Sequence, residues 1–105
     1  MATVRLSKAA QKDLVSIRRY IREELNNPQA AVRIIAGLKN SILSLQIFPE
    51  RGRPLDAVIS VHTEYRYLVW EHYCIFYLPS EEGSIVIRIL HQRQDFMRAL
   101  FSDER

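Results

Sequence analysis

The stretch Ile-Val-Ile-Arg-Ile-Leu-His-Gln-Arg-Gln-Asp, residues 85–95, has the composition of a strand followed by a polar exit. β-Branched side chains dominate its first half, which predicts a strand over Ile85–Leu90. Alternate side chains of a strand lie on one face. The residues that would share a face are Ile85, Ile87, Ile89 and His91. We expect the three isoleucines to face a core of helices.

Two similar runs come before this strand. Glu64 to Trp70 and Tyr73 to Leu78 are both rich in aromatic and β-branched residues. We expect a tight turn at Glu71-His72 between them, and the Pro, Ser and Gly content of residues 79–84 indicates another turn. The C-terminal half therefore predicts a three-stranded antiparallel meander, followed by a short helix or an irregular tail over residues 95–101.

The N-terminal half has the patterning of helices. Residues 3–6 alternate as a short strand, and Ser7 is a good N-cap. An apolar stripe at helical spacing follows: Ala10, Leu14, Ile17, Ile21 and Leu25. Asn27 and Pro28 restart the pattern as cap and first helical residue. The second stripe consists of Ala31, Ile34 or Ile35, Leu38, Ile42 and Leu45. Gly37 interrupts this second helix, which predicts a close approach to another element.

The order β-α-α-β-β-β predicts an α+β fold in which a helical hairpin packs on one face of an antiparallel sheet. The 105 residues fit a single domain over 1–105, which buries roughly 60–70% of the surface of its unfolded chain. Residues 48–57 form the loop between hairpin and meander. The uncovered face of such a sheet is available to a partner.

Composition excludes several classes of protein. A single cysteine, Cys74, allows no internal disulfide, and no Cys/His spacing indicates zinc, so we expect neither a metal nor a cofactor. Neither a signal peptide nor a membrane span of about 18 apolar residues is evident, which favours a cytoplasmic protein without membrane contacts. The basic residues, mostly arginine, concentrate in the first half. They suit a solvated helix face, an acidic protein partner or nucleic acid.

Several strings in this order resemble the RelE/ParE superfamily of toxins from type II toxin–antitoxin pairs. These strings are residues 10–14 with Ile17 and Tyr20-Ile21, residues 28–31, the loop 48–54, Arg66 with residues 73–77, and residues 87–95. The resemblance covers nearly the whole chain. It implies the fold above and a cognate antitoxin partner, with operator DNA contacted only through the antitoxin.

The superfamily contains two activities, and the resemblance leaves both open. RelE-like members are metal-free endoribonucleases that cut messenger RNA in the ribosome, whereas ParE-like members inhibit DNA gyrase by binding. A nuclease here would use His91 as acid or base and Arg66 and Arg93 as a phosphate clamp. However, no carboxylate base is evident beside them, and Glu64 and Glu71 are candidates only because they are nearby in the sequence. Phe96 and Phe101 occupy the region where many RelE-like nucleases have a tyrosine or lysine. The loop and the exit segment are more similar to ParE, although a non-toxic relative that only binds its partner is a third possibility.

A partner surface is predicted on the open face of the sheet. By strand periodicity, Arg66, Leu68 and Trp70 would share this face with Arg88 and Leu90. An antitoxin segment, docked as a helix or added as a strand, would cover it, or else the C-terminal tail would fold over it.

Three other residues have structural alternatives to a functional role. Arg51 and Arg53 in the loop are either target contacts or merely solvated. His91 is either functional or a hydrogen-bonded residue at the rim of the core that ties down the tail through Asp95.

Overall fold

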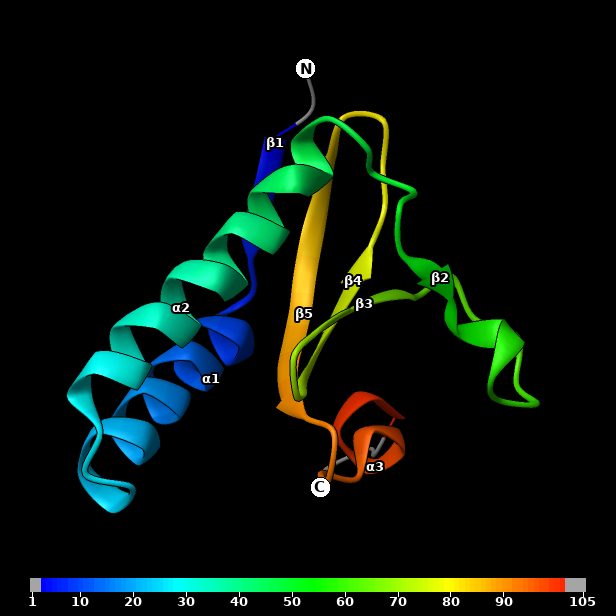
Figure 1. Ribbon diagram of the computed structural model, residues 1–105. Coiled ribbons are helices and arrows are strands. Elements are labelled where there is room, and N and C mark those ends of the chain that lie inside the picture. Colours follow the sequence, from blue (N-terminus) through cyan, green and yellow to red (C-terminus); the bar gives the residue numbers. More distant parts are fainter. Residues whose placement is uncertain (1–2, 102–105) are drawn as a thin grey trace.

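Two helices lie along one face of a five-stranded sheet, and a short C-terminal helix lies on the opposite face (Figure 1). The computed structural model describes residues 3–101. The helices are α1 (Lys8–Arg19), α2 (Pro28–Leu43) and α3 (Phe96–Phe101). The strands are β1 (Thr3–Leu6), β2 (Arg53–Pro54), β3 (Arg66–Trp70), β4 (Tyr73–Leu78) and β5 (Gly83–His91). No helix in this range is long and apolar enough to cross a membrane.

The sheet has the order β1-β5-β4-β3-β2. Strands β3, β4 and β5 form the predicted antiparallel meander, with Glu71 at a φ of 53° in the tight turn between β3 and β4. Strand β1 pairs in parallel with β5, so the sheet is mixed rather than wholly antiparallel. A parallel neighbour needs a long crossover connection, and the helical hairpin is part of the chain that provides one. The α+β prediction is confirmed.

Both helices begin at the predicted caps. The Ser7 hydroxyl accepts a hydrogen bond from the Ala10 N–H at 3.0 Å, and it donates to the Ile87 carbonyl at 2.7 Å, which ties the start of α1 to β5. The Asn27 side chain accepts from the Ala30 N–H at 3.1 Å, and Pro28 opens α2.

The first apolar stripe ends at Ile21, four residues before the predicted Leu25. Helix α1 widens into a π-helical turn over Tyr20–Glu24. The wider turn places fewer degrees between successive residues, so a stripe that follows the α-helical period drifts off the buried face. As a result Ile21 is buried, whereas Leu25 is 55% exposed.

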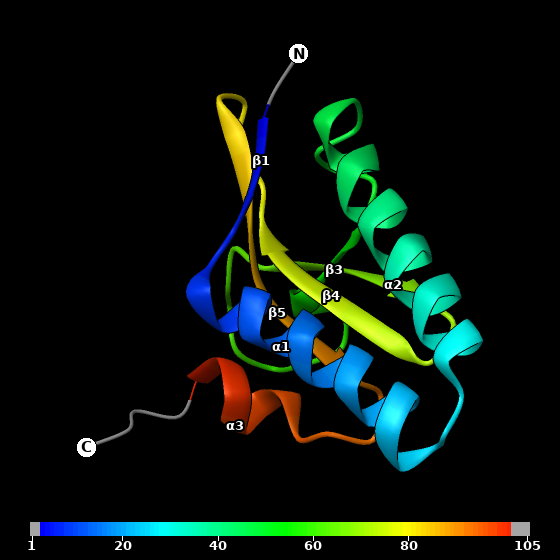
Figure 2. The same cartoon turned by 90° about the vertical axis from the view of Figure 1, so that its left-hand side faces the viewer.

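The main core lies between the hairpin and the sheet (Figure 2). Its buried members include Leu38 and Ile42 from α2 and Ile75 and Tyr77 from β4. A Cβ atom on Gly37 would overlap the indole ring of Trp70. The predicted close approach at Gly37 is therefore confirmed, and its neighbour is a β3 side chain on the helix-facing side of the sheet.

A β-bulge changes the predicted alternation of β5. Phe76 pairs with Arg88 and Tyr77 pairs with Val86, so Ile87 is the extra residue. The bulge shifts the phase of the strand by one residue. Ile89 and Val86 consequently join the main core, and the prediction that Ile85 and Ile87 face the helices was wrong.

Candidate partner-binding site

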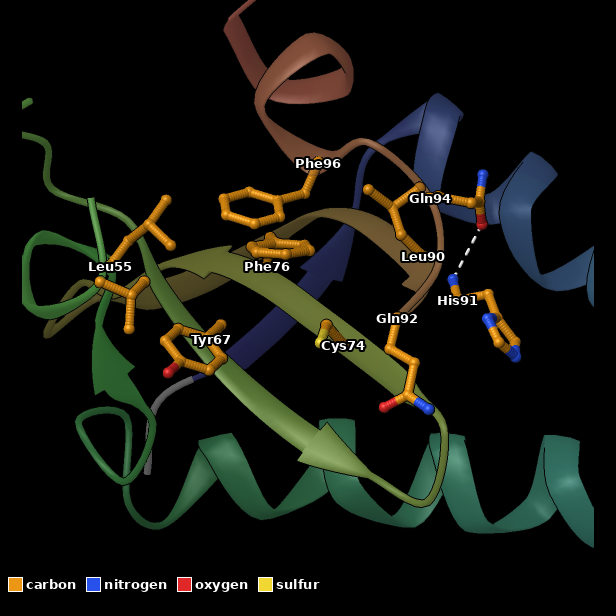
Figure 3. Close-up of a pocket in the computed structure, with 10 residues that line it drawn as sticks. Leu55, Tyr67, Cys74, Phe76, Leu90, His91, Gln92, Gln94 and Phe96 are labelled. Atoms are coloured by element: carbon orange, nitrogen blue, oxygen red, sulfur yellow. Dashed lines mark hydrogen bonds between the residues drawn. The ribbon is translucent and has the colours of Figure 1, made fainter. Parts of the chain in front are cut away.

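The open face of the sheet carries a second, smaller apolar cluster, shown in Figure 3. Its buried residues are Leu55, Phe76 and Leu90. Beside them lies an open hollow of about 290 Å³. Its walls are mostly apolar, from the 55–58 loop, β3, β4, β5 and α3, and its polar end is formed by residues that leave β5. The lining residues are Leu55, Val58, Tyr67, Cys74, Phe76, Leu90, His91, Gln92, Gln94 and Phe96.

Helix α3 covers one side of this cluster. The Phe96 ring stacks on the Phe76 ring with 5.3 Å between centroids, and Phe101 meets Tyr65 edge-on at 5.7 Å. Asp95 accepts a hydrogen bond from the Arg98 N–H at 3.2 Å at the start of the helix. Six residues are too few for a helix to persist alone in water, so α3 is held by these side-chain contacts. The alternative in which the tail folds over the open face is therefore what the structure shows around Leu90.

We had predicted that Leu68 and Trp70 lie on the open face of the sheet. The structure contradicts this prediction. Both belong to the main core, and Leu68 is only 7% exposed. Their partners across the strand pair are Ile75 and Tyr73, which are also main-core residues. The alternation within β3 was right, but the strand faces the helices with the opposite set of side chains. The open-face residues of β3 are thus Tyr67 and Val69.

Arg88 is tied to helix α1. Its Nε and one terminal nitrogen donate to the two carboxylate oxygens of Asp13 at 2.8 and 2.9 Å. Asp13 also accepts from the Ile89 N–H at 2.8 Å, so it closes the edge of β5 beyond the end of β1. These hydrogen bonds, opposed by burial, raise the pKa of Arg88 above its ordinary value. Arg88 is therefore an internal brace rather than a free partner contact.

The arginines around residues 48–54 differ in their freedom. Arg66 donates to the backbone carbonyls of Glu50 and Gly52, and Arg51 donates to the Ser44 hydroxyl at 2.6 Å. These bonds hold the loop against β3 and the end of α2. Arg53 is exposed, and its side chain makes no hydrogen bond or ion pair within the described residues 3–101. Arg53 is thus the loop arginine that remains available to a target.

Arg66 and His91 lie at opposite ends of the meander. Arg66 pairs with Tyr77, whereas His91 pairs with Tyr73, which lies four residues earlier in β4. At about 3.3 Å per residue the offset along the strands is roughly 13 Å, and two strand spacings of about 4.8 Å separate β3 from β5. His91 and Arg93 do lie together, because the Arg93 N–H donates to the His91 ring. Arg66 lies apart from both, so the predicted convergence of all three residues was wrong. The two residues are separated because β3 and β5 run in the same direction. Arg66 is the first residue of β3, whereas His91 is the last residue of β5.

His91 organises the turn that leaves β5. Its backbone N–H donates to the Gln94 side-chain oxygen at 2.8 Å, and its ring Nδ1 accepts from the Arg93 N–H at 3.1 Å. Its ring and the Tyr73 ring are nearly perpendicular, with 5.3 Å between centroids. These contacts agree with the prediction that His91 is a hydrogen-bonded residue at the rim of the core. The tail is held through Gln94 and Arg93, however, and not through Asp95, which caps α3.

Cys74 is a strand residue, as predicted, and it is only half-buried because it lines the open-face hollow. Burial raises the pKa of its thiol. Raising the pKa disfavours the thiolate, so the cysteine is a poor nucleophile in this state.

Sequence reasoning missed the apolar rim of the open face. Val58 lines the hollow and is 54% exposed, and Val69, beside Cys74 on the neighbouring strand, is 61% exposed. The predicted loop ended at residue 57, so Val58 had no assigned role. Placing Leu68 and Trp70 on the open face had implied the core side for Val69. The correct phase of β3 would have revealed Val69. Exposed apolar residues around an apolar hollow are typical of a surface that a protein partner covers.

Among residues 3–101, no group of three or more His, Cys, Asp and Glu side chains is arranged to hold a metal ion.

Comparison with solved structures finds the same α+β architecture in two toxin–antitoxin systems. The chain is similar to a toxin–antitoxin structure described as the chromosomal ParDE system from P. aeruginosa, with a TM-score of 0.71, 20% identity, and coverage of 87% of this chain and 96% of that one. It is also similar to the toxin–antitoxin complex RelBE2 from Mycobacterium tuberculosis, with a TM-score of 0.60, 21% identity, and coverage of 86% and 96%. The fold is thus that of the RelE/ParE class.

The family model for the ParE toxin of the type II toxin–antitoxin system parDE matches residues 4–96. The chain belongs to this family. No curated protein sequence matches it.

Proposed function

We propose that the chain is a toxin that inhibits DNA gyrase by binding and is neutralised by a cognate antitoxin. The family match over residues 4–96 carries this proposal. The geometry agrees with a binding function, because Arg66 and His91 lie too far apart to act on one phosphate and Arg66 is occupied by loop carbonyls. Metal-free RNA cleavage requires an acid, a base and cations gathered at one scissile phosphate. Gyrase as the target would place the protein in the cytoplasm.

The open face is the proposed antitoxin surface. It offers an apolar hollow next to Phe76 and Leu90, with Val58 and Val69 exposed at its rim. An amphipathic antitoxin segment that folds on binding would bury these side chains. The two similar solved structures are both described as toxin–antitoxin systems. We therefore expect a cognate antitoxin as the partner of this chain. Operator DNA would be contacted only through that antitoxin.

A gyrase assay tests the proposed target. The purified chain should inhibit DNA supercoiling by gyrase in a dose-dependent way, and an equimolar amount of the antitoxin should restore supercoiling. In cells, induction should cause DNA damage and filamentation while transcripts stay intact. Cleaved transcripts in ribosomes, with normal supercoiling, would instead establish the RelE-like endoribonuclease. Gyrase and transcripts that are both unaffected would indicate a relative that only binds its partner.

A further inference from the structure

A second hollow lies on the other side of the segment that leaves β5. It has a volume of about 400 Å³ and opens between helix α1 and residues 91–94. We call it the exit pocket, and its lining residues are Ser16, Ile17, Tyr20, Tyr73, His91, Arg93 and Gln94. His91 and Gln94 line this pocket and the open-face hollow, so the exit segment is the wall between the two. The antitoxin surface proposed above is the open-face hollow, which is separate from the exit pocket.

Hydrogen bonds within the exit turn determine which polar atoms remain free in this pocket. The Nδ1 atom of His91 accepts from the Arg93 N–H, so the neutral imidazole carries its proton on Nε2 and can donate there. The side-chain oxygen of Gln94 accepts from the His91 N–H, which leaves the amide nitrogen as the free end of that side chain. The two side-chain acceptor atoms are thus used within the turn, and the side-chain N–H donors of His91 and Gln94 remain free for a ligand.

The remaining polar groups of the pocket are also donors. The Arg93 guanidinium is exposed, and within residues 3–101 it forms no ion pair. The hydroxyls of Tyr20 and Tyr73 have no hydrogen-bond partner in the same range. Burial first, and then the Tyr20 hydroxyl and Glu71, raise the pKa of Tyr73, so its hydroxyl stays protonated at neutral pH.

Negative charge is lacking at the pocket wall. None of the lining side chains is a carboxylate. Glu71, the one acidic group that influences Tyr73, is held by Arg33 in an ion pair of 2.8 Å. A pocket with a guanidinium, an imidazole N–H, an amide and two phenols, and with no carboxylate, is complementary to an anion with several oxygens.

We propose that the exit pocket binds a phosphate group, either as free phosphate or as the monoester of a nucleotide. Phosphate offers enough oxygens for the fork of Arg93 and for the donors of His91 and Tyr73 together. The half-exposed ring of Tyr20 at the mouth provides a face on which a base can stack, and the volume of about 400 Å³ accommodates a small ligand.

Titration of the full chain tests this proposal. Sodium phosphate, adenosine 5′-monophosphate and adenosine would each be added to ¹⁵N-labelled protein, and the Arg93 amide and the His91 ring signals would be followed by NMR. We expect saturable shifts with the two phosphate compounds and none with adenosine. Equal affinities would identify free phosphate as the ligand, and tighter binding of the monophosphate would identify a nucleotide. Absence of saturable shifts at these residues would overturn the proposal.

Three variants identify the pocket as the site. Arg93→Gln should weaken phosphate binding at least tenfold, because it removes a charged donor. Tyr73→Phe should weaken it about threefold, because it removes one neutral hydroxyl. Arg5→Gln removes the same charge from exposed β1 and should change the affinity less than twofold. Equal losses in Arg93→Gln and Arg5→Gln would mean that net charge alone attracts the anion, and the pocket assignment would fail. Arg93 is exposed, so its variant is expected to fold even if Tyr73→Phe does not.

Discussion

The two faces of the sheet differ in how many buried apolar side chains they carry. On the helix side, α1, α2, β3, β4 and β5 all contribute buried side chains to one core cluster. On the open side, among residues 3–101, only Leu55, Phe76 and Leu90 are buried, and a six-residue helix covers them. The difference indicates that the two faces have different roles. The helix side stabilises the fold, whereas the open side has a thin cover that a partner could extend or replace.

Leu38→Ala should have the largest effect, because it removes packing from the centre of the helix side. Leu38 is fully buried, and a leucine truncation in such a position costs about 3 kcal/mol. Urea unfolding followed by circular dichroism measures this loss. Val32→Ala, on the same helix but 72% exposed, should cost less than about 0.5 kcal/mol. If both variants lost the same stability, the helix side would not be the main source of it.

Asp13→Ala should have the next largest effect, because Asp13 joins α1 to β5 through three hydrogen bonds. Its removal leaves the partly buried Arg88 and the Ile89 N–H without their partner, at a cost of about 2 kcal/mol. The exposed pair of Arg22 and Glu23 is a matched control, and Glu23→Ala should cost less than about 0.5 kcal/mol. The same denaturant titration compares the two. A negligible loss in Asp13→Ala would show that the brace is not stabilising.

Phe96→Ala should have a smaller effect on stability and a clear effect on the open face. Phe96 is only partly buried, so we expect a loss of about 1 kcal/mol rather than the larger cost of a core aromatic. Loss of the stacking on Phe76 should loosen α3 and hydrate Cys74. The pKa of the Cys74 thiol should then fall toward its ordinary value, and its reaction with a thiol reagent at neutral pH should accelerate.

Met97→Ala provides the control for that experiment. Met97 lies on the same helix, but it is outside the open-face cluster and is 37% exposed. The rate of thiol modification should stay close to that of the unmodified chain. If Phe96→Ala left the thiol equally slow, α3 would not be what shields the open face.

Local patterns in the sequence predicted the elements well, but not the faces of the strands. The stripes of α1 and α2 and the caps at Ser7 and Asn27 depend on neighbours three or four residues away. The structure confirms them, except for Leu25 at the end of the first stripe. The bulge at Ile87 depends on how β5 registers against β4, which no pattern within β5 records. The phase of β3 was likewise undetermined, because both of its faces carry apolar residues. That error alone moved Leu68 and Trp70 to the wrong side.

The partners of the arginines were beyond sequence reasoning for a similar reason. Arg88 meets Asp13 across 75 residues of chain, and Arg66 meets carbonyls 14 and 16 residues away. An arginine that braces the fold has the same appearance in a sequence as one that contacts a target. Only the tertiary structure separates Arg88 and Arg66 from Arg53 and Arg93.

Val69→Glu should have the smallest effect on the free energy of unfolding, but it should clearly weaken antitoxin binding. Val69 points away from the main core and is 61% exposed, so a charge there should change the free energy of unfolding by less than about 0.5 kcal/mol. If the antitoxin covers the open face, the same charge would be buried without a partner, and the affinity for the antitoxin should fall at least tenfold. Isothermal titration with the purified antitoxin measures this.

Val32→Glu places the same charge on the outer side of α2, where the valine is also exposed, at 72%. An antitoxin on the open face should not detect this second change, so its affinity should stay within twofold. The opposite result, with Val32→Glu weakening binding and Val69→Glu tolerated, would move the antitoxin onto the hairpin. The thin packing beneath α3 would then need another explanation, since the side of the sheet with the weaker core would not be the side that a partner covers.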